Sequence, residues 1–480
     1  MGKTIASRLA FATVALACLA AVGAGGSWGA RPDGYSIDST TLYTGAQAWW
    51  NAGYTGSGVD VAVIDSGIAP VPGLDAPGKV VHGPDLSLES QAPNLTRLDT
   101  FGHGTFMSGL IAADGGGYRG MAPGARLVSL KVASADGGAD VSQVIAAIDW
   151  VVQHAHDPGL NIRVLNLSYG TNSRQSYLVD PLAYAAEQAW KHGILVVAAA
   201  GNSGYQRGNG VQGLADPAYD PYLLAVGGSD SLGTLDTRDD VVGDYSAGAC
   251  AGCRRPDLVA PGSHLQGLRV PGSFIDARHA EARLGDRFFR GTGTSEAAAI
   301  VSGAAALVLE RYPGLTPDLV KRYLERHATS LRGVGPHLQG AGLIDLASML
   351  RDEPQLNAPP QRHPTATGLG SLELARGLDH VTRDEVVLAG ERDIFGKPWN
   401  AAAMAAAQAT GSSWSGGMWN GSSWSGSSWS GSSWSGSSWS GSSWSGSSWS
   451  GSSWSGSSWS GSSWSGSSWS GSSWSTASWS

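Results

Sequence analysis

Short apolar runs alternate with helix-like segments along the first 350 residues of the chain. The run at 59–64, Val-Asp-Val-Ala-Val-Ile, is almost continuously apolar and β-branched, and Asp65 ends it. Such runs are typical of strands buried on both faces of a parallel sheet. Further strands are predicted at 126–132, 164–168, 194–200 and 223–226, with helical patterns between them at 142–156 and 182–192. The alternation predicts an α/β fold of three layers, with a mostly parallel β-sheet between helices.

A glycine-punctuated turn leads into an alanine-rich apolar segment at 290–310. The segment predicts a buried helix, and Ser295 falls in its first turn. Backbone N–H groups in the first turn of a helix have no intrahelical partner, and the helix dipole is positive there. An oxyanion beside Ser295 would therefore be stabilised by groups already in place. The alternative interpretation is a Thr or Ser N-cap that only starts a buried helix.

The N-terminal residues carry the pattern of an export signal. Lys3 and Arg8 precede an uncharged run at 9–22, and small residues follow it. This run is shorter than the roughly 20 apolar residues that span a bilayer. We therefore expect a signal peptide at 1–24, a secreted protein and no transmembrane anchor.

Charge and cysteine content narrow the class of protein. Charged residues make up 15% of the chain and the net charge is −8 without a basic patch, so we expect no nucleic-acid partner. Cys250 and Cys253 stand close together, and a local disulfide is the expected state in an exported chain. A redox-active or zinc-binding pair is the alternative, but the sequence offers no second pair of ligands.

The C-terminal part differs in composition from the rest. Residues 351–410 show no sustained periodicity and are expected to form a linker, although 401–409 could be helical. From 411 to 480 the motif Gly-Ser-Ser-Trp-Ser recurs every five residues, a period that matches neither a helix nor a strand. We expect this repeat tail to be disordered or self-associating. Its indoles also motivate a second hypothesis, a cell-wall-associated adhesin or binding protein whose main role lies in the tail.

Four polar residues form a candidate catalytic set. Ser295 needs a base to remove its proton, and His103 carries an imidazole, which titrates near neutral pH. Asp65 follows a strand and suits the second nitrogen of that imidazole, while Asn202 suits a developing oxyanion. Each residue alone also fits an ordinary role in a turn or at a helix start. Together they predict nucleophilic acyl transfer.

The motifs around these residues resemble the signature blocks of a known family. Val-Ala-Val-Ile-Asp65-Ser-Gly, Gly-His103-Gly-Thr, Ala-Ala-Ala-Gly-Asn202 and Gly-Thr-Ser295 occur in the order found in the subtilisin-like serine peptidases, the S8 family. The resemblance predicts a subtilisin-like peptidase domain over 25–350. It implies a secreted serine endopeptidase with broad specificity for protein and peptide substrates.

The resemblance also implies how substrate binds. Segment 131–138 resembles the edge strand that pairs with the substrate backbone, and 168–170 resembles the opposite wall of the primary pocket. The candidate substrate-binding residues are Gly137, Gly138, Ser168, Tyr169 and Gly170. No cofactor is implied for catalysis. Structural calcium is common in the family, but the sequence shows no dense carboxylate loop that would assign a metal site.

The sequence departs from the family pattern beside the candidate nucleophile. Glu296 stands where members usually carry methionine, Ala299 replaces a usual proline, and Phe106 stands where histidine is frequent. A carboxylate near the catalytic residues would raise the pKa of His103. We therefore expect Glu296 to affect the pH dependence of the reaction.

Overall fold

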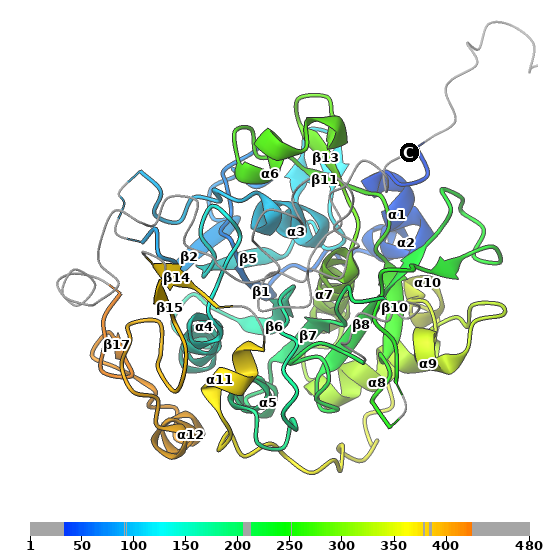
Figure 1. The fold of residues 1–480 in the computed structure, drawn as a ribbon. Coiled ribbons are helices and arrows are strands. Elements are labelled where there is room, and N and C mark those ends of the chain that lie inside the picture. Colours follow the sequence, from blue (N-terminus) through cyan, green and yellow to red (C-terminus); the bar gives the residue numbers. More distant parts are fainter. Residues whose placement is uncertain are drawn as a thin grey trace, which may run out of the picture. The chain divides into compact units, whose positions relative to one another are not determined.

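The predicted strands lie in one parallel sheet. The computed structural model describes residues 33–424 apart from 91, 93, 205–212, 251, 378–379 and 384–385, so the predicted signal peptide and the repeats beyond 424 lie outside the described residues. The strand order is β10-β8-β7-β6-β1-β5-β2, and each neighbouring pair is parallel (Figure 1). The strands are β1 (Asp60–Asp65), β2 (Val80–Asp85), β5 (Arg126–Lys131), β6 (Ile162–Leu167), β7 (Leu195–Ala199), β8 (Leu224–Asp230) and β10 (Leu258–Pro261).

Two strands of this sheet escaped prediction. The edge strand β2 contains His82, Gly83 and Pro84, which are residues that sequence patterns place in turns. The opposite edge strand β10 has only four residues and ends in a proline. Both strands take their conformation from the neighbouring strand rather than from a strong pattern of their own.

Helices cover both faces of the sheet. α3 (His103–Ala112) and α7 (Thr294–Arg311) lie on one face, and α4 (Val141–His154) and α5 (Pro181–Lys191) lie on the other (Figure 1). α7 contacts α3 and the strands β6, β7, β8 and β10. It is apolar around most of its circumference and almost entirely buried, which suits a helix enclosed by other elements. The predicted three-layer α/β architecture is therefore confirmed.

Smaller elements surround this core. They are the helices α1 (Ile37–Tyr43), α2 (Ala46–Asn51), α6 (Phe274–Arg278), η1 (Ala280–Ala282), α8 (Pro317–His327), α9 (Pro336–Gln339) and α10 (Leu346–Met349), and the strands β3 (Asp114–Gly115), β4 (Tyr118–Arg119), β9 (Val241–Val242), β11 (Leu265–Leu268), β12 (Arg283–Leu284) and β13 (Phe288–Gly291). Cys250 and Cys253 form the predicted disulfide. None of the helices in the described part of the chain is long and apolar enough to cross a membrane.

Residues 351–424, which we call the C-terminal extension, correct the prediction of a linker. They form α11 (Leu372–Arg376), the hairpin of β14 (Thr382–Arg383) and β15 (Val386–Val387), α12 (Ala401–Ala409) and the hairpin of β16 (Trp414–Ser415) and β17 (Met418–Trp419). α11 packs against α4 and α5, α12 packs against α5, and β16 packs against α4. Apolar side chains of the extension belong to the same buried core as the sheet. The prediction of a linker is therefore wrong for these residues, while the helix predicted at 401–409 is confirmed.

The first tryptophans of the repeat tail are part of this core as well. The indole N–H groups of Trp414, Trp419 and Trp424 donate to Ala146 O (2.9 Å), Asp149 Oδ2 (2.7 Å) and Leu86 O (2.8 Å), respectively. Trp419 and Trp424 are buried and their rings lie 6.0 Å apart. The expectation of a disordered tail is thus wrong for 411–424, because each of these indoles packs against apolar side chains of the domain and donates to an acceptor there.

Candidate active site

Asp65 and His103 form a buried pair at the carboxyl end of the central strand. Asp65 is the last residue of β1, and His103 is the first residue of α3. His103 Nδ1 lies 2.9 Å from both carboxylate oxygens of Asp65, and the two side chains are each 1% exposed. A carboxylate in this position fixes the tautomer and orientation of the imidazole and stabilises its protonated form. The structure confirms that these two predicted residues lie together.

Two residues that the sequence analysis missed hold this pair in place. Ser66 donates to Asp65 Oδ1 through its backbone N–H (2.7 Å) and to Asp99 Oδ1 through its hydroxyl (2.8 Å). Asp99 also accepts the backbone N–H groups of Gly102 (2.7 Å) and Thr105 (2.8 Å), on either side of His103. Asp99 therefore shapes the turn that begins α3. The sequence signal was an aspartate shortly before a glycine-flanked helix start.

The electrostatic surroundings favour the protonated form of His103. Burial by itself lowers the pKa of the imidazole, but the charge and hydrogen bond of Asp65 outweigh burial, and Glu296 and Asp99 add to the effect. The pKa of His103 is consequently raised above its usual value. Glu296 follows Ser295 in α7, so the start of that helix lies close enough to His103 for its charge to be felt.

Ser295 lies in the first turn of α7, as predicted, and Thr294 connects that turn to Asn202. Asn202 Oδ1 accepts the backbone N–H and the hydroxyl of Thr294, both at 2.9 Å. Thr294 Oγ1 in turn accepts the backbone N–H of Gly201 at 3.0 Å. A backbone N–H can only donate, so these contacts fix which end of the Asn202 amide is the oxygen. The NH₂ end of Asn202 therefore points away from Thr294.

The alternative interpretation of this helix start, a Thr or Ser side chain at the N-cap, does not hold. The N-cap residue is Gly293, which has no side chain to offer, and Thr294 is already helical. The hydroxyl of Thr294 binds the Asn202 loop instead of the helix N–H groups. The backbone N–H of Thr294 is bound by the Asn202 side chain, and the N-cap residue has no side chain to cap the turn.

The candidate substrate-binding residues flank the pair from two strands. Ser168 follows β6 and donates its hydroxyl to Ser295 O at 3.1 Å, so its side chain supports α7. Gly137 has φ +83°, and a Cβ there would lie 2.6 Å from the ring of Phe101. Gly138 O accepts the backbone N–H of Ser134 at 3.2 Å. Segment 131–138 therefore packs on Phe101, two residues before His103, while Tyr169 and Gly170 are buried beyond β6.

Glu296 and Phe106 lie together beneath the start of α7. A Cβ at Gly291 would lie 2.4 Å from Glu296 Oε1 and 2.7 Å from the Phe106 ring. A Cβ at Gly267 would lie 2.5 Å from that ring as well. Both side chains are buried, so Phe106 has a packing role and Glu296 places a carboxylate inside the site.

We predict that Glu296→Gln and Glu296→Met shift the acidic limb of the pH–rate profile to lower pH. The base must be neutral to accept a proton, and removing a nearby carboxylate lowers the pKa of His103. Measurement of kcat/KM between pH 5 and 9 tests this. Glu310→Gln, at the far end of α7, removes a carboxylate that binds the N–H groups of Thr55 and Gly56 and is the matched control. A limb that stays in place in Glu296→Gln would contradict the prediction.

A metal centre finds no support within the part of the chain that the structure describes. No group of three or more His, Cys, Asp or Glu residues there is arranged to hold a metal ion.

Comparison with known proteins gives a consistent result. The model of the Subtilase family matches residues 56–342 and so ends before the C-terminal extension. Serine protease AprX of Bacillus subtilis (strain 168) is 36% identical over 300 residues, which cover 61% of this chain and 66% of AprX. Subtilisin BL of Lederbergia lenta is 33% identical over 308 residues, which cover 64% of this chain and 96% of that protein. The crystal structure of a cold adapted subtilisin-like serine proteinase is 28% identical, with a TM-score of 0.46 over 61% of this chain and 90% of that one.

Proposed function

The chain belongs to the Subtilase family, and on that basis we propose that it is a serine endopeptidase whose catalytic residues are Asp65, His103 and Ser295. The observation that carries the proposal is the buried Asp65–His103 pair, whose nitrogen and oxygen atoms are 2.9 Å apart. His103 starts α3, which packs against α7, the helix whose first turn contains Ser295. The order Asp, His, Ser along the chain is that of subtilisins.

The reaction is acyl transfer in two stages. His103 removes the proton of Ser295 Oγ, which attacks the peptide carbonyl carbon and forms a tetrahedral intermediate. The protonated imidazole, stabilised by Asp65, then gives its proton to the leaving amine and an acyl-enzyme remains. Water, activated by the same imidazole, releases the acyl group and restores the serine hydroxyl. No cofactor takes part in these steps.

Asn202 supplies a donor for the oxyanion of the intermediate. Thr294 holds its oxygen, so its NH₂ group is presented on the other side, and the Ser295 backbone N–H joins it as a second donor. We predict that Asn202→Leu lowers kcat by about 10²–10³-fold with little change in KM, because the donor acts mainly in the transition state.

Steady-state kinetics with a peptide anilide measure this effect. Asn161→Leu is the matched control, since Asn161 Nδ2 binds Gly58 O at the amino ends of the strands, far from the reaction. Its kcat should stay within about twofold of the wild type. Equal loss in both variants would remove Asn202 from the mechanism.

Covalent labelling tests the function itself. A fluorophosphonate should react with Ser295 alone and abolish hydrolysis of casein, because only an activated serine displaces fluoride at neutral pH. Peptide mass spectrometry locates the adduct. Labelling at another serine, or hydrolysis that survives full labelling of Ser295, would refute the proposal.

The substrates are extracellular proteins and peptides, which bind between segment 131–138 and residues 168–170. Export rests on the signal-like pattern at 1–24 and on the disulfide between Cys250 and Cys253. The adhesin hypothesis has no support from the relatives, and the first three indoles of its proposed binding tail bind the peptidase itself. We do not retain it.

A further inference from the structure

Segment 131–138 is held at its first end by a shared carbonyl. Leu86, just after β2, donates its N–H to Lys131 O at 2.7 Å. The carbonyl of Leu86 accepts two donors, Gln143 Nε2 at 2.6 Å and Trp424 Nε1 at 2.8 Å. Gln143 Nε2 also reaches Val132 O at 3.2 Å. The indole of Trp424 therefore helps to hold Leu86, whose N–H in turn binds the first residue of the segment.

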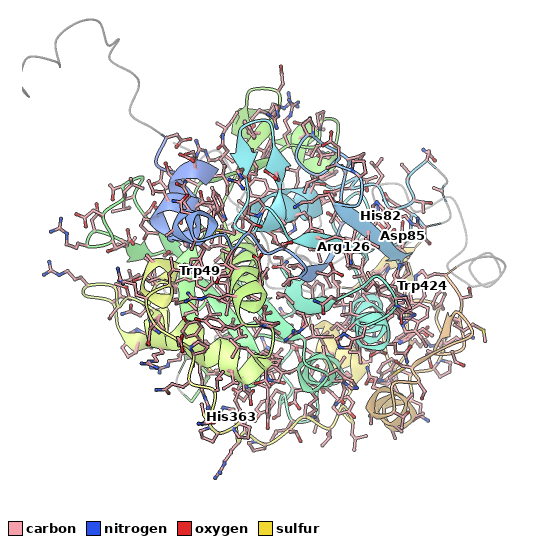
Figure 2. The ribbon with its side chains drawn as sticks, turned by 180° about the vertical axis from the view of Figure 1, so that it is seen from behind. Trp49, His82, Asp85, Arg126, His363 and Trp424 are labelled. Carbon is pink, nitrogen blue, oxygen red and sulfur yellow. A yellow bond between two sulfur atoms is a disulfide. The ribbon has the colours of Figure 1, made fainter. Side chains whose placement is uncertain are left out.

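Figure 2 shows Trp424 beside the end of β2, where Asp85 is labelled, and both line the same cavity. The Trp424 ring is 6% exposed and lies 4.5 Å from the ring of Phe395 and 5.7 Å from that of Trp414. Because its position is fixed by packing on both sides, its N–H is directed at Leu86 at no further entropic cost.

An ion pair from the same extension holds the other end of the segment. Asp140, two residues after Gly138, is the N-cap of α4, and its side chain accepts the backbone N–H of Ser142 at 2.9 Å. Arg376 Nε donates to Asp140 Oδ2 at 2.6 Å, and both side chains are 0–1% exposed. Arg376 also donates to Gly390 O at 2.8 Å. A fully satisfied buried guanidinium of this kind fixes geometry more than it adds stability.

We propose that the C-terminal extension is a specificity-determining part of the peptidase, in which Trp424 and Arg376 are positioning residues for the substrate-binding segment 131–138. The inference rests on the proposed function. The two residues touch no substrate; they set the spacing of a segment whose backbone pairs with an extended peptide. A peptide with several residues before the scissile bond uses this segment, whereas a single-residue ester uses only the primary pocket.

The test removes one hydrogen bond and keeps the ring. Trp424→Phe is expected to raise KM for succinyl-Ala-Ala-Pro-Phe-p-nitroanilide about fivefold, the factor that one neutral hydrogen bond corresponds to, with little change in kcat. KM for N-acetyl-tyrosine ethyl ester should change less than twofold. Trp414→Phe is the matched control, because it removes the same kind of bond from the body of α4 at Ala146. Its KM should stay at the wild-type value for both substrates.

Arg376→Lys provides a second measurement that keeps the charge but loses the fork of donors. It should raise KM for the peptide anilide in the same selective way, with folding checked by thermal denaturation. If the wild-type enzyme is active but Trp424→Phe and Trp414→Phe have equal KM values for the peptide anilide, the inference is overturned and the proposed function still stands. A wild-type protein that cleaves neither substrate and takes no fluorophosphonate would instead refute the proposed function.

Discussion

Ser295→Ala is expected to lower kcat for peptide hydrolysis about 10⁶-fold while leaving the fold intact, the magnitude known for subtilisin itself, a member of the same family. The loss is large because the nucleophile and its base act as a unit. The fold should survive because Ser295 contributes its backbone carbonyl, not its hydroxyl, to the contact with Ser168 at 3.1 Å. Steady-state assays at high enzyme concentration measure the residual rate of hydrolysis. Circular dichroism checks that the secondary structure is unchanged.

A second serine of the same helix gives the control for this prediction. Ser302 is buried in α7 and donates its hydroxyl to Asn166 Oδ1 at 2.9 Å. Ser302→Ala should lower stability by about 1 kcal/mol and leave kcat within about twofold of the wild type. If Ser295→Ala retained more than about one part in 10³ of the activity, acyl transfer through Ser295 would be wrong.

Local pattern was sufficient for the central strands of the sheet and for the catalytic candidates Asp65 and His103. The runs that became β1, β5 and β6 are buried on both faces, so they carry a signal that does not depend on tertiary context. Asp65 could be placed at the site because a parallel sheet gathers the carboxyl ends of its strands at one edge. His103 was predicted as the base because its imidazole titrates near neutral pH. The resemblance to a known family then connected them to Asn202 and Ser295.

The supporting residues and the extension could not be predicted in this way. Asp99 accepts the hydroxyl of Ser66, 33 residues away, and Thr294 accepts the backbone N–H of Gly201, 93 residues away. A periodicity carries no information on such contacts. The C-terminal extension shows no hydrophobic periodicity, because its short elements pack against α4 and α5 through single buried apolar side chains. The low complexity of the tail predicts disorder. The indoles of Trp414, Trp419 and Trp424 nevertheless bind the domain, because each packs on apolar side chains and donates to one acceptor.

Trp419→Ala is expected to destabilise the protein by about 3–5 kcal/mol, the usual cost of emptying a buried tryptophan site. Its ring is 0% exposed and lies 5.9 Å from that of Trp399. Chemical denaturation of the full chain measures the free energy of unfolding. A change below about 1 kcal/mol would show that the extension is not part of the cooperative unit.

Trp419→Phe separates the hydrogen bond from the packing through its pH dependence. Burial raises the pKa of Asp149 to about 7, and the Trp419 indole N–H opposes burial by stabilising the anion. Removing that N–H therefore costs more above pH 7, where Asp149 is ionised in the folded protein, than near pH 5, where it is protonated. The control is Trp414→Phe, whose indole N–H binds the uncharged Ala146 O, so its cost should not vary between these pH values. If the costs of both variants changed alike with pH, the contact between Trp419 and Asp149 would not be what anchors the extension to α4.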